Sequence, residues 1–117
     1  MRKALQIKVS GEQVVVDLDS GDSSLNVMQD AVGGYIECVS LSRDLDMYVN
    51  EEGKLIGLDH NTVATHLWSM VYGQGTGTIE GDVLLTGGVD LEGETLGLTE
   101  YVHTLLENMA PVAMSGS

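Results

Sequence analysis

Short apolar segments, separated by glycines and polar residues, run through most of this 117-residue chain. Some segments alternate apolar with polar residues, which is the period of a half-buried strand. Others repeat an apolar residue every three or four positions, which is the period of an amphipathic helix. A chain of this length typically forms one domain, since domains hold roughly 100 to 150 residues. The pattern predicts a single α+β domain over residues 1–110, with a small, twisted, mostly antiparallel sheet and two to three helices packed on it.

The N-terminal segment is expected to form a β-hairpin. Ala4–Val9 and Gln13–Asp19 are rich in apolar residues and flank the turn Ser10–Gly11–Glu12, and a glycine in such a turn is typical of a hairpin. Glu51–Glu52–Gly53–Lys54 has the same turn character, so the centre of the chain is predicted to form a β-meander. The expected strands beyond the hairpin are Tyr35–Leu41, Asp46–Asn50, Leu55–Leu58 and Ile79–Leu85.

Helices are expected where apolar residues recur at helical spacing between a polar capping residue and a glycine or proline. The last helix is predicted to stop at the single proline of the chain, which leaves residues 111–117 as a flexible tail. The second and third helices are predicted to pack on the sheet through Val63, Leu67, Val102, Leu105 and Leu106. The three expected helices run from Ser23 or Ser24 to Gly33–Gly34, from Asp59 or Asn61 to the glycine tract Gly73–Gly77, and from Thr99 to Pro111.

The charge of the chain argues against several classes of partner. Eighteen Asp and Glu residues against five Lys and Arg residues leave a net charge of −13, and this field repels nucleic-acid phosphates and anionic lipid head groups. No stretch approaches the ~20 consecutive apolar residues that a membrane-spanning helix requires. We therefore expect neither direct nucleic-acid binding nor membrane association. A lone cysteine, Cys38, cannot form an intramolecular disulfide and indicates a reducing cytoplasm.

No cluster of residues supports catalysis or a metal site. Cys38 alternates with Glu37 along an expected strand and is interpreted as a small core residue, because so acidic a chain offers no electropositive setting to activate a thiol. His60 and His66 lie six positions apart, on different faces of a helix, so they cannot share a zinc ion. The acidic turn at residues 17–22 lacks the glycine and glutamate positions of an EF-hand. We expect a non-catalytic protein with no cofactor.

Three stretches of the chain combine glycines, amides and carboxylates in a distinctive way. They are Leu25–Glu37, which contains Val-Gly-Gly-Tyr-Ile-Glu, Val49–Leu55, which contains Asn-Glu-Glu-Gly, and Asn61–Thr65. In combination they resemble a family of small bacteriophage and actinobacterial proteins that is known only as a domain of unknown function. The similarity extends over residues 5–98. It implies a small mixed α/β domain and carries no activity with it.

These stretches contain polar residues that a hydrophobic core does not need. Their amides and carboxylates could bind a polar molecule through hydrogen bonds, and the glycines would let the backbone approach it closely. We expect the ligand where the turn Gly33–Gly34–Tyr35 approaches the hairpin Asn50–Lys54 and the helix N-terminus at Asn61. The same residues also fit ordinary turn and cap chemistry. The candidate ligand-binding residues are Gln29, Gly33, Gly34, Tyr35, Glu37, Asn50, Glu51, Lys54 and Asn61.

Two functions fit these observations. The first is a phage accessory protein, in the cytoplasm of an infected bacterium, that binds a small polar ligand without turnover; a nucleotide signal of host defence is a candidate ligand. The second is an acidic interaction protein that blocks a basic, DNA-binding surface of a host protein, for which the net charge is the motive. In either case we expect a homo-oligomer, most readily a dimer, because a small core leaves apolar and strand-edge surface to cover.

Overall fold

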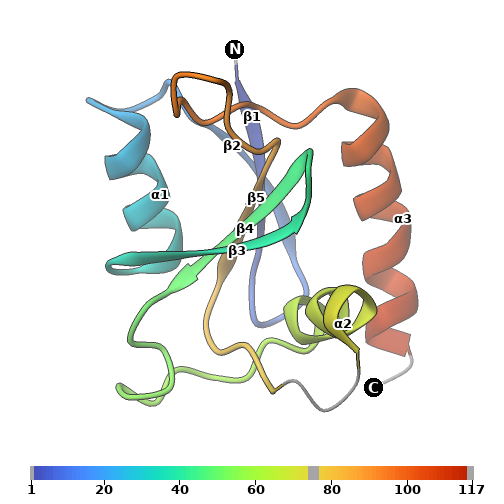
Figure 1. Ribbon diagram of the computed structural model, residues 1–117. Coiled ribbons are helices and arrows are strands. Elements are labelled where there is room, and N and C mark those ends of the chain that lie inside the picture. Colours follow the sequence, from blue (N-terminus) through green and yellow to red (C-terminus); the bar gives the residue numbers. More distant parts are fainter. Residues whose placement is uncertain (1, 74–76, 116–117) are drawn as a thin grey trace.

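The computed structural model of the chain describes residues 2–73 and 77–115 (Figure 1). Within these ranges, five strands form one open antiparallel sheet in the order β2-β1-β5-β4-β3, and three helices pack on it, which confirms the predicted α+β fold. The elements are β1 (Lys3–Ile7), β2 (Gln13–Asp17), α1 (Ser24–Val32), β3 (Ile36–Ser42), β4 (Leu45–Asn50), α2 (Thr62–Tyr72), β5 (Val83–Thr86) and α3 (Glu100–Ser115).

The N-terminal hairpin forms as predicted. β1 and β2 pair in register from Lys3 opposite Asp17 to Ile7 opposite Gln13, and the backbone N–H of Gly11 donates to the Lys8 carbonyl in the turn between them. On its other side β1 pairs with β5, the last strand in the sequence, which lies in the middle of the sheet. The hairpin is thus joined to the β3–β4 pair only through β5.

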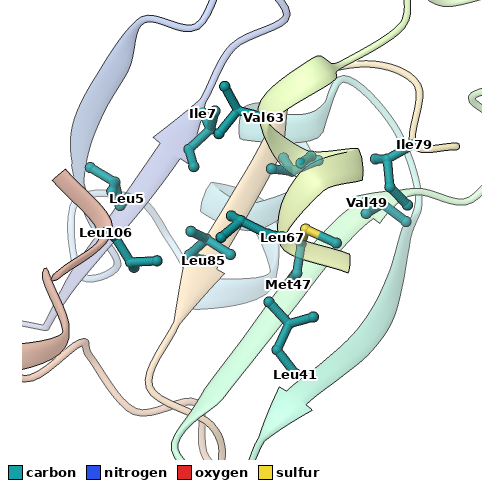
Figure 2. Close-up of a cluster of buried hydrophobic side chains, with 12 residues drawn as sticks. Leu5, Ile7, Leu41, Met47, Val49, Val63, Leu67, Ile79, Leu85 and Leu106 are labelled. Atoms are coloured by element: carbon teal, nitrogen blue, oxygen red, sulfur yellow. The ribbon is translucent and has the colours of Figure 1, made fainter. Parts of the chain in front are cut away.

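One face of the sheet is covered by α2 and α3 (Figure 1). Side chains alternate between the two faces of a strand, so Met47 and Val49 of β4 point toward α2 while Tyr48 points to the opposite face. Figure 2 shows this cluster, with Leu67 of α2 beside Met47 and Leu85. Its twelve buried members are Leu5, Ile7, Leu41, Met47, Val49, Val63, Ala64, Leu67, Ile79, Val83, Leu85 and Leu106.

The other face of the sheet is covered by α1. The Ser23 hydroxyl accepts a hydrogen bond of 3.1 Å from the Asn26 backbone and caps the start of this helix. Gly33 ends it with φ +79°, in the left-handed region that favours glycine, as the sequence predicts. The buried residues of this smaller cluster are Ala4, Leu18, Val27, Met28, Val32, Tyr48 and Leu84.

The predicted strand Leu55–Leu58 is wrong, and with it the central meander. Residues 51–57 form turns, and the Leu55 side chain is 84% exposed. β4 is already flanked by β3 and β5, so no edge remains for another strand beside it. The Asn50 side chain also accepts from the Glu52 backbone N–H at 2.8 Å, which favours a turn directly after β4.

The last strand is shorter than predicted. Regular pairing covers Val83–Thr86, whereas Ile79 lies outside the strand and Glu80 makes only an isolated bridge with His60. Gly81 adopts φ +87°, a conformation that interrupts an extended strand. The segment before β5 therefore runs past α2 as a separate connection and contributes Ile79 to the core.

Three further expectations about packing and helix ends are corrected. Leu105, predicted to be buried, is 43% exposed, whereas Leu106 is buried. Cys38, predicted as a core residue, is exposed, since α1 covers only part of its face of the sheet. α3 begins after Thr99, whose hydroxyl accepts from the Val102 backbone, but it continues through Pro111 to Ser115, so the proline does not end the helix although it removes one intrahelical donor. Over the described ranges, no helix is both long and apolar enough to cross a bilayer.

Candidate ligand-binding site

A pocket of about 300 Å³ lies on the α2 side of the sheet, where the turn after β4 meets the segment before β5. Its apolar wall consists of Val39, Val49 and Ile79, which belong to or border the larger core cluster. Trp68 of α2 also lines the pocket and packs on the same cluster. We call this cavity the Trp68 pocket. An apolar wall with an aromatic ring and a few polar groups is the usual composition of a small-molecule site.

The polar side of the pocket is organised around Lys54. Its ammonium donates to the carbonyl and the hydroxyl of Thr78 and to Oε1 of Glu80. Glu80 is largely buried, and its Oε2 also lies 3.5 Å from Nδ1 of His60. Desolvation raises the pKa of Glu80, but the hydrogen bonds from Lys54, Thr78 and His60 outweigh it and hold the pKa below its ordinary value. Glu80 is therefore a carboxylate at neutral pH.

Two more carboxylates, those of Glu37 and Glu51, line the same pocket. Glu37 is opposite Val49 in the β3–β4 register, and Glu51 follows β4 in the turn. Both side chains are exposed, and neither makes a hydrogen bond or an ion pair with any residue in the described part of the chain. Among the described residues, the pocket thus combines one engaged cation, one engaged carboxylate and two carboxylates without partners.

The structure divides the sequence-predicted site residues between two places. Glu37, Asn50, Glu51 and Lys54 line the Trp68 pocket. A separate hollow of about 430 Å³ beside α1 is lined by the other predicted residues apart from Asn61, which are Gln29, Gly33, Gly34 and Tyr35.

The turns that line the two hollows are joined by hydrogen bonds. The Glu51 backbone N–H donates to the Tyr35 carbonyl at 2.9 Å, and Asn50 Nδ2 donates to the Val32 carbonyl at 3.2 Å. A Cβ added to Gly34 would lie 2.9 Å from Asn50 Nδ2, so any larger residue here would have to displace the Asn50 amide. The two turns do come together, but protein groups fill the contact between them.

Asn50 and Asn61 are buried and have their amide groups occupied by the protein. Asn61 Oδ1 accepts from the Ala64 backbone at 3.0 Å, and its Nδ2 donates to the carbonyls of Ile7 and Gly81 at 3.0 and 2.9 Å. This is cap chemistry, extended by two bonds that tie the start of α2 to β1 and to the segment before β5. Asn61 does not line either hollow.

Besides the apolar wall, sequence reasoning missed Trp68 and the polar residues Thr78 and Glu80 of the Trp68 pocket. The available signal was that Trp68 is the single tryptophan of the chain and lies near the edge of the apolar stripe of its helix. Glu80 gave no signal because it was assigned to the predicted strand Ile79–Leu85 rather than to a connection that passes α2, and Thr78 lies just before that predicted strand.

Cys38, Asp46 and Tyr48 form a polar cluster on the opposite face of the sheet, and this cluster has less to offer a ligand. Partial burial and the nearby Asp46 carboxylate raise the pKa of the Cys38 thiol, which disfavours the reactive thiolate. Burial likewise raises the pKa of Tyr48. Over residues 2–73 and 77–115, no group of three or more His, Cys, Asp or Glu side chains is placed to hold a metal ion.

Comparison with known protein families places the chain in a family. The model of a protein family described as a domain of unknown function, DUF3846, matches residues 1–110. No curated protein and no solved structure matches the chain.

Proposed function

The chain belongs to the DUF3846 family, and we propose that it binds a small polar ligand in the Trp68 pocket and holds it without chemical change. The observation that carries the proposal is the pocket itself, which joins an aromatic ring and an apolar wall to the Lys54–Glu80 ion pair. Its volume of about 300 Å³ is at the lower end of the range for small-molecule sites. A ligand of this kind would be a small metabolite or signal rather than a polymer.

Binding without turnover is favoured by the protonation state of the pocket. A general acid or base works best when its pKa lies near the ambient pH. The pKa of Glu80 is instead lowered, away from neutrality, and its oxygens are occupied by Lys54 and His60. The group that is best placed to act on a ligand is thus held as a fixed carboxylate.

The biological role that we propose follows from the resemblance to bacteriophage proteins. A phage protein that holds a small ligand in the host cytoplasm would lower the free concentration of that ligand. A nucleotide signal of host defence is one candidate, since a base could stack on Trp68. Its phosphates would have to compete with Glu80 for Lys54.

A thermal-shift screen of the full chain tests the proposal, with nucleotides, amino acids, diamines and dicarboxylates as separate groups. A ligand at about 100 times its Kd should stabilise the fold by about 2.7 kcal/mol. Trp68→Ala should abolish the shift. The matched control is Tyr35→Ala, which removes an exposed aromatic from the other hollow and should leave the shift unchanged. The opposite result would place the ligand beside α1, and no shift from any group would refute the proposal.

A second function, the acidic interaction protein, is favoured by the loop between β5 and α3. Val89 and Thr95 pair across it, and Asp90 Oδ1 accepts from the backbones of Glu92 and Glu94 at 2.8 and 2.9 Å. This ordered loop presents the fully exposed side chain of Leu91 among carboxylates. A basic surface with an apolar hollow would complement it.

The measurement for this second function is affinity capture from a bacterial lysate with the wild type and with Leu91→Asp. The second function is supported if the wild type retains a DNA-binding protein that excess duplex DNA releases and that Leu91→Asp does not retain. Equal capture by both proteins would remove this loop as the interface.

A further inference from the structure

We propose that the Trp68 pocket selects a cation: its ligand carries an ammonium or guanidinium group that lies between Glu37 and Glu51, with an apolar chain against Trp68. This inference rests on the proposed function and adds the chemical class of the ligand. The same group can be supplied by a free amine or by a lysine or arginine side chain of another protein.

The first argument is the occupancy of Lys54. An ammonium group has three donors, and the three acceptors of Lys54 are the Thr78 carbonyl, the Thr78 hydroxyl and the Glu80 carboxylate. An anionic ligand could gain Lys54 only by displacing one of these protein acceptors. The only cation that lines the pocket within the described residues is therefore already fully engaged.

The second argument is the imbalance of charge that remains. Within residues 2–73 and 77–115, three carboxylates and one ammonium line the pocket, and Glu80 neutralises that ammonium. Glu37 and Glu51 are then left without a counter-ion in the described part of the chain. An anion placed between them would be repelled, whereas a cation would supply the partner that both lack.

The third argument concerns the surroundings of these carboxylates. Trp68 presents an aromatic surface in the same cavity, and cations are attracted to the face of an indole ring. Val39, Val49 and Ile79 form an apolar wall, and the exposed side chain of Leu55 borders the opening. An alkyl chain that carries a positive group matches both parts. The net charge of −13 also draws cations toward the protein over a distance.

Isothermal titration of the full chain with agmatine, which joins a guanidinium and an ammonium through four methylenes, tests the inference. Glutarate and butane-1,4-diol are the anionic and neutral comparisons. The double variant Glu37→Gln/Glu51→Gln removes both charges at exposed positions while keeping their size. The matched control is Glu52→Gln, an exposed neighbour that does not line the pocket. Melting without ligand confirms that each variant is folded.

We expect agmatine to bind the wild type and Glu52→Gln alike and to lose at least tenfold in affinity with the double variant. A second probe is a short arginine peptide that is acetylated at its N-terminus and amidated at its C-terminus. If this peptide binds and loses the same affinity in the double variant, while agmatine does not bind, the cation belongs to a partner protein. If a nucleotide or glutarate binds in a Trp68-dependent manner and the double variant binds it equally or more tightly, the cation inference fails while the proposed function stands. If no compound of any class binds, both fail.

Discussion

Asn61 is the residue whose replacement tests the packing of this fold most sharply. Its side chain is fully buried and makes three hydrogen bonds, one as the cap of α2 and two to the carbonyls of Ile7 and Gly81. Loss of a cap costs about 1 kcal/mol, and a buried acceptor that loses its donor costs about 1 to 3 kcal/mol. With one cap and two such acceptors lost, we expect Asn61→Ala to lower the free energy of unfolding by about 3 to 7 kcal/mol, out of a total of about 5 to 15 kcal/mol.

Asn61→Asp separates the two roles. Aspartate caps a helix as well as asparagine does, but it has no N–H to donate and would point a carboxylate oxygen at two carbonyls. Its cost should therefore equal or exceed that of Asn61→Ala, measured by urea denaturation followed by circular dichroism. Asn26→Ala, at an exposed position of α1, is the control and should stay within about 0.5 kcal/mol of the wild type. Wild-type stability in Asn61→Asp would show that only the cap matters and refute the reasoning.

Three further predictions concern packing, pH and assembly. Gly34→Ala should cost about 1 to 2 kcal/mol by displacing the Asn50 side chain, and this cost should largely vanish in an Asn50→Ala background. Because the folded pKa of Glu80 is lowered, its contribution to stability is present above the ordinary glutamate pKa of about 4.3 and is lost as the pH falls through the folded pKa. The difference in unfolding free energy between wild type and Glu80→Gln should accordingly shrink on acidification, and a constant difference would contradict the assignment. Light scattering on a concentrated sample should give the mass of a dimer, since β2 and β3 are the outer strands of an open sheet; a monomer mass at every concentration would exclude it.

The parts of this fold that sequence reasoning predicted correctly depend on local chemistry. Thr99 was predicted as a cap, Gly33 belongs to the predicted stop Gly33–Gly34, and Ser23 and Asn61 were each one of two predicted caps. Such residues can be predicted because a cap acts within one turn of its helix. The N-terminal hairpin was found because its turn and its alternation lie in one short stretch. These signals do not depend on what the rest of the chain does.

The wrong strand at Leu55–Leu58 and the missed pocket residues share a physical origin in strand order. A strand at Leu55 would have to pair with an edge of β4, but β5 already occupies that edge. Because β5 lies far along the chain, no residue near Leu55 indicates that the edge is taken. The same arrangement brings Glu80 to Lys54 and sets Trp68 opposite the β3–β4 pair. The pocket is thus built from segments that long-range pairing brings together, and periodicity in the sequence does not report such pairing.

The most direct test of the central claim uses Trp68 as its own reporter, because it is the single tryptophan of the chain. Intrinsic fluorescence of the full-length protein is followed while agmatine is added, and the binding constant is compared with that from calorimetry. The account predicts a saturable change in emission whose midpoint matches the calorimetric Kd and weakens at least tenfold in Glu37→Gln/Glu51→Gln. Calorimetric binding that leaves the emission of Trp68 unchanged would contradict it, because the ligand would then lie outside the pocket.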